Sequence, residues 1–153
     1  MCAKINFLAV VPETHKNKTI YKAFFFCKKT GYLLSIKVNQ DIVDFLVRKR
    51  GAGLTRDDCC LACLLKDICS NKIILARHNK NYETIFSLRW LWWKREIHTP
   101  FFYGFMVSNL YKIPMEIDES ILRDQGIKIT KEFLEQSLIE VVKSPLSETS
   151  ADI

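Results

Sequence analysis

The sequence predicts a single α/β (α+β) domain in which helices flank one mixed, strongly coiled β-sheet. The chain of 153 residues is 48% hydrophobic and 26% charged, which is the profile of a globular protein with a real core. Segments of strand and helix character also follow one another in the order β-β-β-α-α-β-β-α-β-α-α. We expect the domain to span residues 1–143, with a disordered polar tail at residues 144–153.

The N-terminal third predicts three strands and a helix. Residues 4–11 and 19–29 are rich in β-branched and aromatic side chains and flank a polar turn, as in a hairpin. Residues 32–38 alternate apolar with polar side chains and predict a third strand. Asn39 is a suitable N-cap for a helix that has a basic last turn and ends before Gly51.

A cysteine-rich helix is expected next, and it raises the question of a metal or redox site. Cys60 and Cys63 form a C-x-x-C motif, but no second pair follows, as a zinc site would need. A thioredoxin-like site would place a cysteine at the helix N-terminus, where Thr55 stands. Core packing is therefore favoured over redox chemistry, and we expect no cysteine metal site.

The second half predicts a strand pair, residues 72–78 and 82–93, around a short polar turn. A helix over residues 101–112 follows, with Thr99 as its N-cap and Pro100 as its first residue. The last predicted elements are a short extended segment (113–117), a brief helix (118–126) and an amphipathic helix (130–143).

Charge is unevenly distributed along the chain. Residues 1–114 carry 19 Lys/Arg and 8 Asp/Glu, a net charge of +11, whereas residues 115–153 carry 4 and 9, a net charge of −5. A basic body suggests a polyanionic partner, nucleic acid first, although an ordinary solvated basic surface has the same composition. Both interpretations stay open on charge alone.

The cellular location is inferred from the shortness of the apolar segments. The longest apolar runs are far shorter than the roughly 20 residues of a membrane-spanning helix, and no cleavable signal peptide is recognised. We therefore expect a cytoplasmic protein with no membrane partner, in which cysteines stay reduced.

The stretch SLRWLWWKREIH, residues 87–98, interleaves three tryptophans with cations, a pattern that can stack bases and neutralise phosphates. The cations are Arg89, Lys94 and Arg95. Strand alternation would place Arg89 and Trp93 on one face, and Trp90 and Lys94 on the other. Tryptophans on both faces also suit a core on one side and a subunit interface on the other, so a homo-oligomer, for example a dimer, is the alternative.

Asp57 and Asp58 are the candidate catalytic residues and the candidate ligands of a divalent cation such as Mg²⁺, since hard cations prefer carboxylate oxygens. Arg56 beside them is a candidate phosphate contact. The alternative is helix capping, because Thr55 and an acid three residues later approximate a capping box. No nucleophile elbow, phosphate loop or histidine-based motif is present in the sequence.

The order of elements resembles the bacterial bifunctional nuclease domain, a family described as acting on both RNA and DNA. The resemblance covers roughly residues 4–142 and is one of pattern more than identity. GFMVSNLYKIPMEIDESILRDQGI resembles the family's DAIALALRTGAPIFVSEEVLEEAGI and keeps the spacing of Pro114, Leu122 and Gly126. GLTRDDCCLACLLKDI resembles the family's RPLTHDLL helix start. It keeps the leucine, the threonine and Asp57.

Most polar positions of the family's motifs differ in this chain. The His of LTHD corresponds to Arg56, and the RPSDA motif corresponds to Pro100 to Gly104. The DG before TFYA corresponds to Tyr82 and Glu83. The glutamate of the EA helix start falls on Ile42, beside Asp41.

Two functions follow from this resemblance. A nuclease-like enzyme would hydrolyse RNA or DNA phosphodiester bonds with a divalent cation near Asp57 and Asp58, and its cations would neutralise phosphates. A divergent member would keep the fold as a non-catalytic nucleic-acid-binding or regulatory module. The loss of acids favours the second, because fewer carboxylates remain to position a metal.

Overall fold

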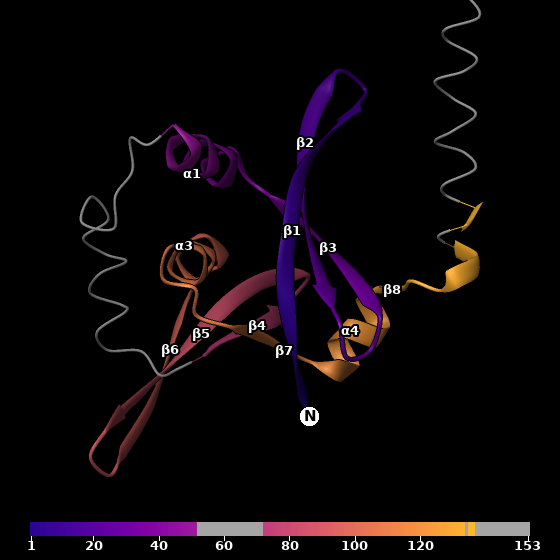
Figure 1. Cartoon of the computed structure of the whole chain (residues 1–153). Coiled ribbons are helices and arrows are strands. Elements are labelled where there is room, and N and C mark those ends of the chain that lie inside the picture. Colours follow the sequence, from indigo (N-terminus) through magenta and orange to yellow (C-terminus); the bar gives the residue numbers. More distant parts are fainter. Residues whose placement is uncertain (52–71, 134, 137–153) are drawn as a thin grey trace, which may run out of the picture.

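One open, mixed β-sheet runs through the computed structural model, which describes residues 1–51, 72–133, 135 and 136 (Figure 1). Its strands are β1 (Cys2–His15), β2 (Lys18–Cys27), β3 (Tyr32–Val38), β4 (Ile73–His78), β5 (Asn81–Trp90), β6 (Trp93–Pro100), β7 (Met115–Asp118) and β8 (Ile127–Lys128). The helices that pack with it are α1 (Gln40–Arg50), α3 (Phe101–Tyr111) and α4 (Glu119–Gln125). The expected α+β class, with helices flanking one mixed sheet, is confirmed.

The eight strands lie in the order β6-β5-β4-β7-β1-β2-β3-β8. The β4–β7 pair is parallel and the other neighbours are antiparallel. Strand β1 joins the two halves, because residues 2–5 pair with β7 while residues 6–15 pair with β2. A register shift between Phe7 and Ala9 lets the strand bend where it passes from one partner to the other.

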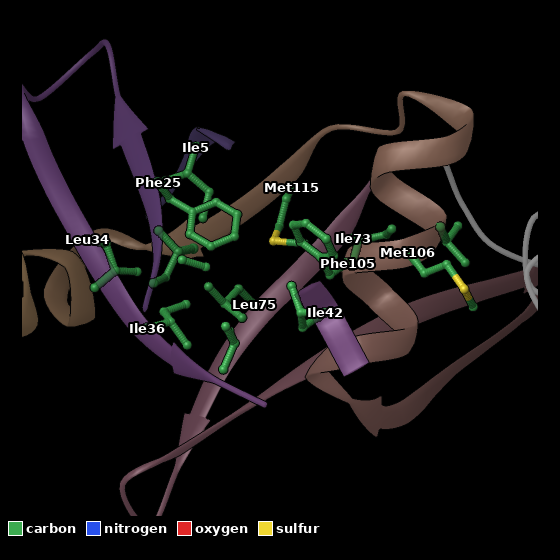
Figure 2. Close-up of a cluster of buried hydrophobic side chains, with 14 of the residues drawn as sticks. Ile5, Phe25, Leu34, Ile36, Ile42, Ile73, Leu75, Phe105, Met106 and Met115 are labelled. Carbon is green, nitrogen blue, oxygen red and sulfur yellow. The ribbon is translucent and has the colours of Figure 1, made fainter. Parts of the chain in front are cut away.

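The core lies between the sheet and the two helices α1 and α3. Figure 2 shows Phe25 of β2 and Leu34 of β3 in one cluster of buried side chains with Phe105 of α3 and Ile42 of α1. Phe105 is almost fully buried, and its ring centroid lies 4.9 Å from that of Phe7 and 6.1 Å from that of Phe45. Burial of one such side chain contributes about 1.5–3 kcal/mol, and Met106, Val107 and Leu110 of α3 are buried as well.

The first hairpin differs from the sequence prediction. A polar turn over residues 12–18 was expected, but the turn consists of Lys16 and Asn17 alone, with φ angles of 47° and 61°. Two positive φ angles in succession are typical of tight two-residue hairpins, which let the strands continue up to the turn. The polar residues therefore extend β1 and β2 into an exposed arm (Figure 1).

The tryptophan-rich stretch also differs from the prediction. A single strand through residue 93 was expected, but the chain turns at Leu91 and Trp92 and returns as β6. The expected N-cap was wrong for the same reason: Thr99 belongs to β6, and Pro100 is the N-cap of α3. The Thr99 hydroxyl is instead 2.8 Å from the hydroxyl of Thr84 on the neighbouring strand.

The remaining predicted elements agree with the structure where it describes them. Asn39 occupies the N-cap of α1, although its side chain makes no capping hydrogen bond. Helix α4 ends at Gly126, and its N-cap Asp118 accepts the backbone N–H of Ser120. Residues 131–133, 135 and 136 are helical, as expected for the last helix. The cysteine-rich helix, the rest of the last helix, the domain boundary at residue 143 and the tail at 144–153 lie outside the described residues.

Gly104 is the point of closest approach between α3 and the sheet. A Cβ atom at this position would overlap the side chain of Thr84, which is fully buried in β5. The absence of a side chain therefore lets the helix backbone rest directly on the strand.

We predict that Gly104→Ala destabilises the protein by about 1–3 kcal/mol, because the added methyl group forces α3 away from β5. Chemical denaturation followed by circular dichroism measures this loss. Gly51→Ala is the matched control: its φ is −76°, and an added Cβ would lie 3.5 Å from the nearest atom, so stability should be nearly unchanged. Equal stability of the two variants would contradict the close approach.

Candidate functional site

A cavity of about 500 Å³ is the strongest candidate site among the described residues. It forms where the end of β3 and the start of α1 meet the β4–β5 turn and the β6–α3 junction. Its lining residues are Ile36, Lys37, Val38, Asn39, Asp41, Ile42, Lys80, Asn81, Tyr82, Pro100, Phe101 and Phe102. Three segments far apart in the sequence thus contribute to one hollow.

The resemblance described above would place the family's polar motifs at these three segments. Asp41 and Ile42 stand at the EA helix start, Tyr82 at the DG position, and Phe101 and Phe102 within RPSDA; all five line the cavity. The resemblance names these positions separately, and the fold brings them together. The two lysines of the cavity were missed, because no local pattern marks them.

Aromatic side chains form one wall of the cavity and are fixed from behind by the core. The ring of Phe101 lies 6.0 Å from Phe25, and the ring of Phe102 lies 6.3 Å from Phe45, both in edge-to-face geometry. Both contacts constrain the rings, so the apolar wall is preorganised rather than free to collapse.

Charged groups complete the lining. Lys37 and Lys80 are exposed residues of the lining. Asp41 supplies a carboxylate, whose Oδ1 accepts the backbone N–H of Ile42 at 2.8 Å. Two cations, one anion and an aromatic wall suit a ligand that combines a phosphate with a flat ring.

Tyr82 brings a phenol to the cavity, and the pKa of this phenol is raised above its ordinary value of 10.0. Burial is the main cause, since it disfavours the phenolate, and the nearby Arg77 partly offsets it. The guanidinium carbon of Arg77 lies 5.9 Å from the centre of the Tyr82 ring. At neutral pH Tyr82 is therefore an uncharged donor that does not repel an anion.

Glu83, the other residue aligned with the DG position, does not line the cavity. It follows Tyr82 in β5, so its side chain points to the opposite face of the sheet. There Oε1 of Glu83 lies 2.8 Å from Nδ1 of His98 in β6. Both side chains are partly exposed, and the pair joins the two strands at the surface.

The remaining sequence-predicted site residues lie elsewhere. Arg56, Asp57 and Asp58 are outside the described residues, so their catalytic, metal-binding and phosphate-binding roles stay predictions. Lys94 and Arg95 are exposed on β6, and Arg89 of β5 pairs in register with Lys94. Lys94 and Arg95 do not line the cavity, and the turn at residues 91 and 92 overturns the face assignment expected for a continuous strand.

The described residues contain no cluster of three or more His, Cys, Asp or Glu side chains that could hold a metal ion. Asp41 is the one carboxylate among the cavity's lining residues in this part of the chain. A Mg²⁺ site at Asp57 and Asp58 stays a prediction. No helix within the described ranges is both long and apolar enough to cross a membrane.

Comparison with known proteins leaves the family assignment as an expectation. A scan against protein-family models finds no match, and a search of curated proteins finds no similar sequence. The resemblance to bifunctional nucleases therefore rests on the motifs quoted above.

We predict that Tyr82 ionises at higher pH than an ordinary tyrosine. The ultraviolet difference between the unmodified protein and Tyr82→Phe, followed against pH, isolates its titration from those of the other tyrosines. Arg77→Gln should raise the pKa of Tyr82 further, because the favourable interaction of the phenolate with the guanidinium is lost. Ionisation at or below the ordinary value would show that the phenol is solvated.

Proposed function

We propose that this protein binds nucleic acid without cleaving it, through the cavity between α1, the β4–β5 turn and the β6–α3 junction. The supporting observation is the juxtaposition of Lys37 and Lys80 with a fixed aromatic wall in one hollow. It corresponds to the divergent, non-catalytic form of the bifunctional nuclease fold expected from the sequence.

The aromatic wall would receive a base. Stacking of a base on an aromatic side chain is worth about 1–3 kcal/mol and is tolerant of sequence. Phe101 and Phe102 are partly buried, so each has surface left for such a contact. A cavity of about 500 Å³ lies within the usual range of 300–1,000 Å³ for small-ligand sites, so one nucleotide of a longer strand fits.

The lysines would receive the phosphates. A Lys–phosphate contact releases condensed counterions, which makes binding sensitive to salt. Residues 1–114 together carry a net charge of +11, and this excess favours the approach of any polyanion over longer distances. The site thus combines a general electrostatic attraction with local stacking.

We predict that Lys37→Ala and Lys80→Ala each weaken the binding of a fluorescent single-stranded oligonucleotide and lower the salt slope by about 1, as expected for one lost phosphate contact. Fluorescence anisotropy at several salt concentrations measures both quantities. Lys28→Ala is the control, because this exposed lysine lies in the β2–β3 turn, outside the cavity lining. Equal effects of all three substitutions would leave only a diffuse basic surface and refute the cavity site.

Phosphodiester hydrolysis is the second candidate function. The observation that favours it is Asp41, which places a carboxylate in the cavity directly beside the position aligned with the family's glutamate. Asp57 and Asp58 would complete an acidic set able to hold a divalent cation and orient a water molecule. This function stays a prediction, as do the homo-oligomer and the cytoplasmic location.

A cleavage assay on labelled RNA and DNA with added Mg²⁺ separates the two candidates. If the protein only binds, we expect no product above background. If it is a nuclease, cleavage should fall by at least 10²-fold, a magnitude typical of lost catalytic groups, in Asp57→Ala or Asp58→Ala. The exposed surface acid Asp124 offers the control substitution Asp124→Ala. Robust cleavage that depends on the acids would refute the non-catalytic proposal.

A further inference from the structure

The tip of the β5–β6 hairpin carries the densest group of exposed apolar side chains in the described residues. Leu91, Trp92 and Trp93 are consecutive in the sequence and are 74%, 84% and 56% exposed. The hairpin extends away from the helices and the rest of the sheet (Figure 1). Three neighbouring large apolar residues in water indicate a contact surface rather than chance exposure.

Leu91 is unfavourable here for a second, independent reason. It opens the two-residue turn with a φ of 52°, a conformation that disfavours large L side chains. Two-residue hairpin turns usually place Gly, Asn or Asp at such a position. A leucine in this turn therefore combines backbone strain with exposure, a combination that points to a function for the side chain.

The hairpin is layered along its axis. Leu91 and Trp92 form the tip, and Trp93 follows them on β6. Lys94 comes next, then Arg95, whose guanidinium carbon lies 5.3 Å from the centre of the Trp93 ring. This order of side chains matches the layers of a lipid bilayer. Apolar groups suit the acyl chains, an indole suits the interface, and cations suit the headgroup phosphates.

We propose that the tip of the β5–β6 hairpin docks on the surface of a bilayer that contains anionic lipids. Leu91 and Trp92 enter the boundary between headgroups and acyl chains, Trp93 lies at the interface, and Lys94 and Arg95 meet the headgroup phosphates. Residues 92–95 of an extended strand span about 10 Å, which matches the depth of about 5–10 Å at which interfacial segments insert. This contact is peripheral and needs no spanning helix, and it differs from the expectation of no membrane partner, which stays a prediction.

Nucleic acid suits the tip less well than lipid. Trp92 is 84% exposed and could stack on a base, but Leu91 has no π surface and Arg95 lies over a face of Trp93. A second copy of the chain also suits it less well, because the cations of the hairpin would approach a chain with a net charge of +6. A bilayer surface is the partner in which the leucine, the indoles and the cations of the hairpin would each find a complementary group.

The tip is separate from the cavity. Five residues of β6 lie between Lys94 and Pro100 at the cavity, so the two are about 20 Å apart along an extended strand. A bilayer at the tip would therefore leave the cavity open, and the two contacts can be tested independently. This inference does not rest on the proposed nucleic-acid binding.

Vesicle binding by the full chain tests the proposal, with vesicles of phosphatidylcholine alone or with phosphatidylglycerol. We expect binding to the anionic vesicles, with a blue shift of tryptophan emission and quenching by brominated acyl chains. Trp92→Ala should weaken binding about tenfold, in line with the loss of one buried large side chain, and Lys94→Ala about fivefold. Val47→Ala, which truncates an apolar side chain of α1 that is 63% exposed, should change nothing.

Three outcomes would overturn the proposal. The first is no binding to anionic vesicles by a chain that circular dichroism shows to be folded. The second is binding without quenching by the brominated lipid, since the indoles would then remain in water. The third is a Trp92→Ala variant that retains vesicle binding but loses affinity for an oligonucleotide, or loses a dimer detected by light scattering, because the tip would then serve a different partner.

Discussion

The close contact between Gly104 and Thr84 fixes the position on which the rest of the site depends. With no side chain at residue 104, α3 rests directly on β5 and can anchor Phe105 in the core. The Thr84 hydroxyl, fully buried, finds its partner in Thr99, so that β5, β6 and the start of α3 are joined at one point. The cavity opens at the same junction, because its lining includes Pro100, the last residue of β6, and Phe101, the first residue of α3.

Local patterns predicted the elements well where the pattern itself determines the structure. Alternation identified β3, and the Asp118–Gly126 segment identified α4. Sequence patterns failed where a turn lacks its usual residues. The β5–β6 turn consists of Leu91 and Trp92 and has no glycine, asparagine or proline, so no local signal marks the hairpin. The wrong N-cap followed from the missed hairpin. A threonine before a proline indicates a helix start only where the threonine is not part of a strand, and Thr99 belongs to β6.

The candidate site was predictable only in part, because its formation is a long-range event. The resemblance named Asp41, Tyr82 and Phe101 as positions of interest, but their meeting depends on the sheet order and on the crossover from β6 into α3. Lys80 could not be singled out, since a lysine in a β-turn is ordinary until the turn is seen beside a cavity. Asp57 and Asp58, the strongest sequence candidates, remain predictions.

The turn at Leu91 and Trp92 changes the meaning of the tryptophan-rich stretch. On a continuous strand, tryptophans would alternate between two faces, and a core and a subunit interface would account for them. On a hairpin, Trp90 and Trp93 pair across the strands in register, and the apolar groups gather at one end. Cations then follow the indoles in order of distance from the tip rather than facing them across a sheet. The same residues thus form a graded surface, apolar at its end and basic behind it, and such a gradient matches a bilayer interface better than a groove that tracks a nucleic-acid strand.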